Sequence, residues 1–116
     1  MIATQNPLVR LQHIRDEIDA ITPLLRGVDH DRYIGDYLLR RAGERALLII
    51  SEAAKSLPKD LLQRYPEVDW SEVIGLGNVL RHGYHAVDDD TIWEILTTNL
   101  SELSPVIDRM IEDLTR

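Results

Sequence analysis

Apolar residues recur along the chain at the three- and four-residue spacing of amphipathic helices, which predicts an all-α fold. A first helix is expected to begin at Asn6-Pro7, with Asn as the cap and Pro at the first helical position, and to end at Gly27. Its apolar stripe is Leu8, Leu11, Ile14, Ile18, Ile21 and Leu25. Asp31 is expected to cap a second, longer helix that ends near Leu57. That helix has the stripe Ile34, Leu38, Ala42, Ala46, Ile49 and Ala53.

Three further helices are predicted from capping residues and prolines. A short segment, KDLLQRY at residues 59–65, is expected to be helical, opened by Pro58 and closed by Pro66. Asp69, followed three residues later by Glu72, is typical of a capping box and predicts the start of a fourth helix. The run VDDDT, residues 87–91, is expected to cap a fifth helix, with a kink at Pro105.

The last predicted helix carries more apolar residues than one stripe needs: Ile92, Ile95, Leu96, Leu100, Leu103, Val106, Ile107, Met110, Ile111 and Leu114. We therefore expect a second apolar face, buried in a homodimer. The 116 residues suffice for one modest core and show no alternating strand pattern. The expected architecture is a single all-α domain spanning residues 1–116, a bundle of four or five helices.

Composition narrows the classes of function. There is no cysteine, which excludes disulfides, thiolate metal sites and a cysteine nucleophile. No run of eighteen uncharged apolar residues and no signal peptide are apparent, so we expect no membrane insertion and a cytoplasmic location. The formal net charge of −7 and the pI of about 4.9 argue against general binding to nucleic-acid phosphates. Contact with RNA would need a local basic patch, for which the candidates are Arg40, Arg41 and Arg45, and then Arg81, His82 and His85.

The densest group of polar residues is the stretch GLGNVLRHGYH, residues 75–85. On a continuous helix with Asn78 at zero, Arg81 falls at about 300°, His82 at about 40° and His85 at about 340°. These side chains would share one face. Leu76, Val79 and Leu80 would anchor the opposite face to the core, and Tyr84, at about 240°, would border the polar face.

Such a face has the groups needed to cleave a phosphodiester without a metal. Imidazole exchanges protons near neutral pH, and guanidinium stabilises charge on a phosphate, which suits attack by an RNA 2′-hydroxyl on its own phosphate. The alternative is a solvated polar helix end, with histidines favoured by the helix dipole. Metal binding by His82 and His85 is a weaker hypothesis, because no third ligand is placed and Asp88, Asp89 and Asp90 are explained as a helix cap.

At these residues the chain resembles HepT-like toxins of the HEPN superfamily. The resemblance rests on three segments, LLIISEAAKSLP, RYPEVDWSEVIGL and RHGYHAVDDDTIWEIL, and covers nearly the whole chain. It implies an all-α homodimer with a metal-independent RNase site, without cofactors, where the two motif helices meet. It also implies a type VII toxin–antitoxin module in which an MntA-like minimal nucleotidyltransferase neutralises the toxin by transferring AMP to the motif Tyr.

Carried over by residue, the resemblance makes Asn78 the polar position, His82 the His and Tyr84 the modified Tyr. The family's Arg position is Gly77 in this chain, which is the main departure. Arg81 follows one turn later and only about 40° around the helix, so its side chain, leaning back, is expected to replace that Arg. Gly77 would then make room for it, or for a second helix crossing at a dimer axis.

Two functions therefore remain open. In an RNase, His82 would act as general base or acid, Arg81 would stabilise the phosphate, Asn78 would orient it and Tyr84 would be the switch. The alternative is a disarmed interaction protein that binds a nucleotidyltransferase without cutting RNA. Tyr84 itself could instead be an aromatic residue at the edge of the core.

Several other residues have more than one interpretation. Arg41 and Arg45, on the same helix side as Glu52, would either contact RNA together with His85 or form surface ion pairs. Trp70 and Trp93 are expected in the core, whereas His13 and His30 are expected on the surface without partners.

Overall fold

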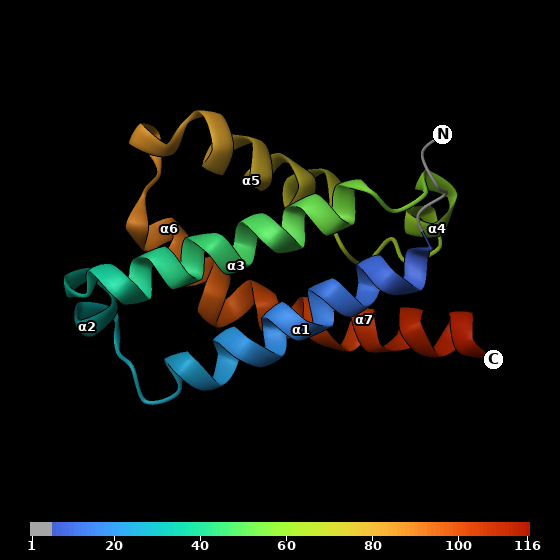
Figure 1. The fold of residues 1–116 in the computed structure, drawn as a ribbon, viewed down its shortest axis with the longest axis horizontal. Helices are drawn as coiled ribbons and strands as arrows, with labels where there is room; N and C mark the ends of the chain where they lie inside the picture. Colours follow the sequence, from blue (N-terminus) through green and yellow to red (C-terminus); the bar gives the residue numbers. More distant parts are fainter. Residues whose placement is uncertain (1–5) are drawn as a thin grey trace.

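A computed structural model describes residues 6–116 of the chain. Four long helical segments dominate it (Figure 1): α1 (Pro7–Leu25), α3 (Tyr37–Lys55), α5 (Trp70–His82), and a C-terminal run of α6 (Asp89–Glu94), the π-helical turn η2 (Ile95–Asn99) and α7 (Leu100–Thr115). The short elements are α2 (His30–Gly35), α4 (Lys59–Gln63) and the 3-10 turn η1 (Tyr84–Ala86). No strand occurs within residues 6–116, so the prediction of an all-α fold is confirmed.

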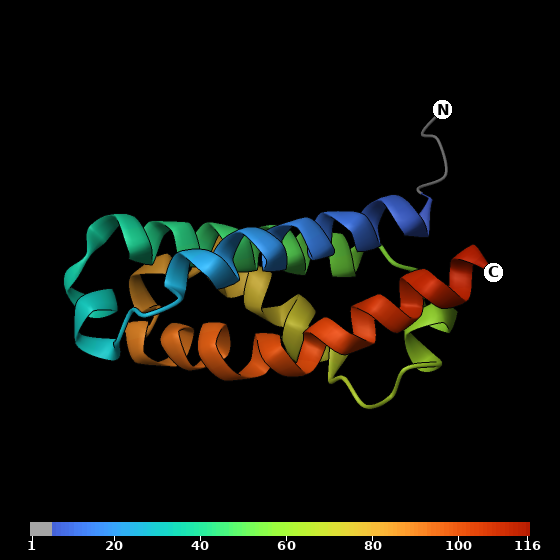
Figure 2. The same cartoon turned by 90° about the horizontal axis from the view of Figure 1, so that it is seen from below.

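The helix α3 is central to the bundle. It lies between α1 and α5 in Figure 1, and it packs mainly against these two helices. Figure 2 shows α1 and α3 in one layer and the run from α6 to α7 in the other. The core between them includes the largest fully buried side chains, which are Tyr33, Leu11, Ile14, Leu47, Ile107 and Met110.

The first helix forms as its capping residues predict. The side chain of Asn6 accepts a hydrogen bond from the backbone N–H of Leu8 at 2.9 Å, and Pro7 is the first helical residue. After Leu25 the chain turns at Gly27, whose φ of 79° lies in the left-handed region that glycine adopts readily.

The predicted second helix is wrong in one respect, because it is divided into α2 and α3. Asp29 caps α2 by accepting from the N–H of Arg32 at 2.9 Å, and Asp36 caps α3 by accepting from Leu39 at 3.1 Å. Asp31, the predicted cap, lies in the first turn of α2. Asp36 both ends one helix and begins the next, since its own N–H bonds to a carbonyl of α2.

The later capping predictions are confirmed. Asp69 accepts from the N–H of Glu72 at 3.2 Å and starts α5, and Asp88 accepts from Asp90 at 3.0 Å and starts α6. Pro105 lies inside α7, and in Figure 2 the axis of the C-terminal run bends beyond η2. The π-helical turn itself was not predicted; the N–H of Leu100 bonds to a carbonyl five residues earlier.

Packing within one chain already accounts for the wide apolar face of the last helix, so this face does not by itself indicate a dimer. Its residues are buried or half-buried within the chain, from Ile92 (2% exposed) to Met110 (0%). The apolar face is wide because α1 packs against α7 and α3 packs against α6. Large exposed apolar residues lie elsewhere, at Val9, Leu24, Tyr37, Leu38 and Val79.

Both tryptophans contribute to the core as predicted. Trp70 is buried and donates its indole N–H to the carbonyl of Tyr65 at 3.0 Å, while Trp93 is half-buried with its ring 5.1 Å from that of Tyr33. Burial raises the pKa of Tyr33 to about 12.

No helix within residues 6–116 is long and apolar enough to span a membrane.

The prediction that His30 lacks a partner is wrong, although His13 is exposed as expected. The Nε2 atom of His30 lies 2.6 Å from a carboxylate oxygen of Asp90, which joins α2 to α6. This contact raises the pKa of His30. The two residues are sixty positions apart, so helical spacing could not reveal the pair.

Candidate functional site

The motif helix, α5, ends at His82, before Tyr84 and His85, which were expected to lie on the same helix. The N–H of Gly83 bonds to the carbonyl of Val79 at 2.8 Å and closes α5 after His82. Residues 84–86 then form the 3-10 turn η1. The helical-wheel positions predicted for Tyr84 and His85 therefore do not apply. His85 is exposed in this turn, and the side chain of Tyr84 lies outside the described part of the chain.

The face of α5 that packs on the core also differs from the prediction. Its buried residues are Trp70 and Gly77, which lie at about 280° and 260° on the wheel, beside Arg81. Val79, predicted to be an anchor, is 45% exposed because it lies almost opposite. Leu76 and Leu80 are half-buried. Asn78 and His82 are exposed at the solvent edge, as the prediction of a polar face requires.

The buried face of α5 meets α3 at very short range. A Cβ atom added to Gly77 would lie 2.6 Å from Cβ of Ser51, which is closer than side chains can approach. The Ser51 hydroxyl donates to the carbonyl of Val73 at 2.6 Å and thereby avoids being buried without a partner. Gly77 thus makes room for α3 of its own chain, whereas nothing lies within 4 Å of a Cβ built on Gly75.

Arg81 extends back along α5 to this crossing. Its Nη1 atom lies 3.8 Å from the Cβ position of Gly77 and 2.6 Å from Oε1 of Glu52 on α3. The side chain of Arg81 is 25% exposed and that of Glu52 is 48% exposed. The guanidinium is therefore fixed next to position 77, as the helical geometry predicted. Its ion pair with Glu52 was missed, because the two residues lie on different helices.

Arg41 and Arg45 lie on the exposed side of α3, whereas Arg40 is half-buried and its Nε atom lies 3.8 Å from a carboxylate oxygen of Asp89. The Nη1 atom of Arg41 lies 2.8 and 2.9 Å from the two carboxylate oxygens of Glu44, and its guanidinium lies 4.7 Å from the ring centroid of Tyr37. The expected surface ion pair exists, but its acid is Glu44 rather than Glu52. Arg45 is exposed and has no ion pair among the described residues.

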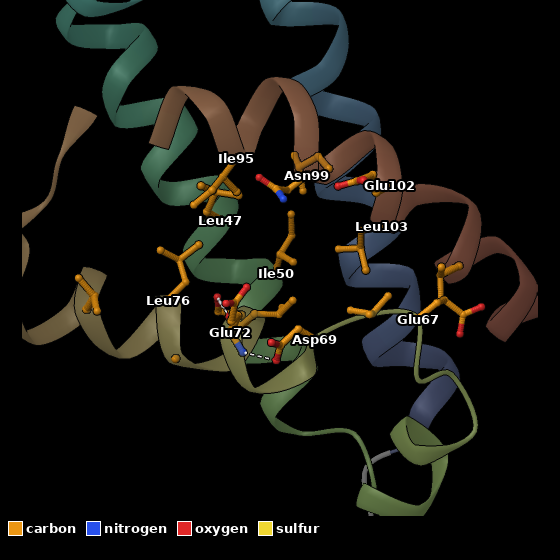
Figure 3. A pocket seen from close by; sticks show the side chains of 17 residues that line it. Leu47, Ile50, Glu67, Asp69, Glu72, Leu76, Ile95, Asn99, Glu102 and Leu103 are labelled. Atoms are coloured by element: carbon orange, nitrogen blue, oxygen red, sulfur yellow. Dashed lines mark hydrogen bonds between the residues drawn. The ribbon is translucent and has the colours of Figure 1, made fainter. Parts of the chain in front are cut away.

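A separate groove of about 800 Å³ lies between α5 and the η2–α7 run (Figure 3). In Figure 3, Leu76 and Glu72 line one side, Ile95 and Asn99 line the other, and Ile50 of α3 lies between them. The described residues that line it include none of the polar motif residues at 78, 81 and 82. Among residues 6–116, no three His, Asp or Glu side chains are grouped closely enough to hold a metal ion.

The structure thus places Asn78, Arg81 and His82 on the last turns of α5, and Glu52 of α3 pairs with Arg81. Such a fold and site define an all-α protein whose motif helix carries a polar group able to contact phosphate and exchange protons.

Comparison with known proteins identifies the family. Residues 14–110 match the family described as Ribonuclease HepT-like, and the chain belongs to this family. It is 31% identical over 108 residues to Putative RNase TTE0752 of Caldanaerobacter subterraneus subsp. tengcongensis, covering 93% of this chain and 96% of that protein. It is 28% identical over 100 residues to Probable ribonuclease HepT of Thermococcus cleftensis, covering 86% and 91%. No solved structure matches the chain.

The tight crossing at Gly77 predicts opposite effects of alanine at two positions of one helix. Gly77→Ala should destabilise the fold by up to about 2 kcal/mol, because overpacking costs about 1–3 kcal/mol and the gain in helix propensity offsets only about 1 kcal/mol. Gly75→Ala, with open space around it, should stabilise the fold by about 1 kcal/mol. Urea denaturation measures both values, and an equal gain at the two sites would contradict the close contact.

Proposed function

We propose that the chain is the RNase toxin of a type VII toxin–antitoxin module of the HepT/MntA kind, and that it cleaves RNA without a metal ion or another cofactor. The main support for this proposal is the position of the Arg81 guanidinium. It lies next to position 77, from which the Arg of the resembling family would extend, and His82 follows it directly on the solvent edge.

In the proposed reaction, His82 takes the proton of an RNA 2′-hydroxyl as that oxygen bonds to the adjacent phosphorus. Arg81 stabilises the added negative charge on the phosphate, and Asn78 donates a hydrogen bond that orients it. The bond from phosphorus to the 5′-oxygen then breaks, and a protonated imidazole supplies the proton that this oxygen needs. His82 of a second copy or His85 would provide that acid.

The test is cleavage of total RNA by the purified protein in EDTA. We expect His82→Ala to lower the rate roughly 10²–10⁴-fold and Arg81→Ala roughly 10²–10³-fold, since the first removes the proton carrier and the second the phosphate contact. His13→Ala and Arg32→Ala, which change exposed residues of the same types on α1 and α2, should retain the parent rate. Cleavage that needs a divalent metal, or that survives both motif variants, would refute this mechanism.

The rival function is a disarmed interaction protein, and two observations favour it. Gly77 stands where the family's Arg is expected, and Glu52 already neutralises the nearest guanidinium. A folded parent protein that binds a nucleotidyltransferase but leaves RNA intact would establish this rival. Gly77→Arg cannot serve as a repair variant, because its Cβ would overlap Ser51 and force α3 and α5 apart.

We further propose that the active form is a homodimer in which a second copy covers the groove beside α5. The proposal is supported by the packing of α5, which contacts mainly α3 and leaves Val79 exposed at the edge of the apolar groove. A second copy seated there would bury Val79 and bring two His82 side chains toward one another.

Two valines of nearly equal exposure allow a matched test of this dimer. Val79→Glu on α5 should shift the protein to a monomer, because it would bury a charge without a partner. Val9→Glu on α1, which changes a residue that is 47% exposed, should leave the dimer intact. Light scattering after gel filtration gives the masses; a monomeric parent, or a dimer in both variants, would refute the proposed interface.

The proposed partner is an MntA-like nucleotidyltransferase that modifies Tyr84. The Tyr84 oxygen would bond to the α-phosphorus of ATP while pyrophosphate leaves, and the resulting phosphodiester would lie two residues from His82. Its negative charge would compete with RNA phosphate for Arg81.

Mass spectrometry after incubation with such an enzyme and ATP should find one added AMP on the peptide that contains Tyr84. Tyr84→Phe should abolish the modification, because it removes the acceptor hydroxyl, whereas Tyr37→Phe, at an exposed tyrosine of α3, should not. Modification at Tyr37 instead of Tyr84 would reject the assignment.

A further inference from the structure

A row of exposed residues follows α3 from its first turn toward the motif. Tyr37 is 59% exposed, and Arg41 and Arg45 continue along the same side at intervals of four residues. The neighbouring Leu38 is 75% exposed but lies about 100° away around the helix, outside this row. Large residues so exposed at the start of a long helix contribute little to the core. Their side chains therefore lie open to contact from solvent.

The ring of Tyr37 and the guanidinium of Arg41 form a stacked pair that remains in water. The guanidinium lies 4.7 Å from the ring centroid, and Glu44 fixes it through two contacts from Nη1. Arg109 and Tyr65 form a looser pair, at 5.9 Å, but Tyr65 is only 7% exposed and its hydroxyl bonds to Asp113. The Tyr65 pair belongs to the packed structure, whereas the Tyr37 pair presents an aromatic surface with an adjacent cation.

The row leads to the proposed cleavage site. From Tyr37 to Glu52 the helix advances fifteen residues, or about 22 Å, and Glu52 holds Arg81 at 2.6 Å. The helices α3 and α5 run side by side in opposite directions in Figure 1, so the exposed row approaches the end of α5 that carries the motif. Arg45 lies between the two ends, and the acids Glu44 and Glu52 are each neutralised by an arginine.

We propose that this row binds single-stranded RNA, with one unpaired base stacked on Tyr37 beside Arg41 and a phosphate on Arg45. This inference rests on the proposed RNase function and names its substrate class. Stacking on an exposed ring requires a base free of its complementary strand, and it tolerates any base because each has an aromatic face. A local row of this kind also lets a chain of net charge −7 bind RNA without an extended basic surface.

The test is the Kd of a labelled oligoribonucleotide of about ten nucleotides, measured by fluorescence anisotropy in the His82→Ala background to prevent cleavage. Tyr37→Leu should weaken binding roughly 5- to 150-fold, the equivalent of one base stack, and Tyr37→Phe should bind like the parent. Leu38→Ala is the control, because it changes a neighbour that is more exposed than Tyr37 but has no ring on which a base could stack, and its Kd should not change. A duplex of the same sequence should be insensitive to Tyr37→Leu.

Three results would overturn the stacking site: an unchanged Kd in Tyr37→Leu, equal weakening by Leu38→Ala, or a change of oligomeric state in either variant. The last two would mean that the row is a protein interface. Failure here is distinguishable from failure of the proposed function. RNA binding that depends on Tyr37 without any cleavage by the parent would reject the RNase and retain the stacking site. Cleavage with the same KM in the parent and in Tyr37→Leu would reject the stacking site and retain the RNase.

Discussion

The close approach of α3 and α5 at Ser51 and Gly77 is the constraint on which the rest of the site depends. Because Gly77 has no side chain and that of Ser51 is small, the helices pack closely enough for the Ser51 hydroxyl to reach a carbonyl of α5. This contact fixes the rotation of α5 about its axis. With Gly77 facing inward, Arg81 must lie against α3, and Asn78 and His82 must lie at the solvent edge.

The same rotation determines the electrostatics of the site. Arg81 is pressed against α3 at the level of Glu52, so a half-buried cation is paired instead of isolated. The Glu52 carboxylate thereby holds the guanidinium in a fixed position and cancels most of its positive potential. In the proposed RNase, RNA phosphate would have to compete with the Glu52 carboxylate for that guanidinium, so the ion pair would weaken the binding of RNA.

Packing on a single side of α5 has a further consequence for assembly. Since α3 provides nearly all of its contacts, the opposite side of α5 faces an apolar groove, and Val79 remains exposed at its edge. The apolar residues of the C-terminal run are already used within the chain. The proposed interface between copies would centre on Val79 of α5 and on the groove between α5 and the C-terminal run.

The sequence by itself determined the helices, because caps and apolar periodicity act within a few residues. Asn6, Asp69 and Asp88 each accept the backbone N–H that their positions predicted, and the family follows from the motif segments. Only the tertiary structure decided which face of α5 is buried, why residue 77 is Gly, and which acid pairs with each arginine. These contacts join residues distant in sequence, such as Arg81 with Glu52 and His30 with Asp90, and they depend on helix rotation, which local spacing does not encode.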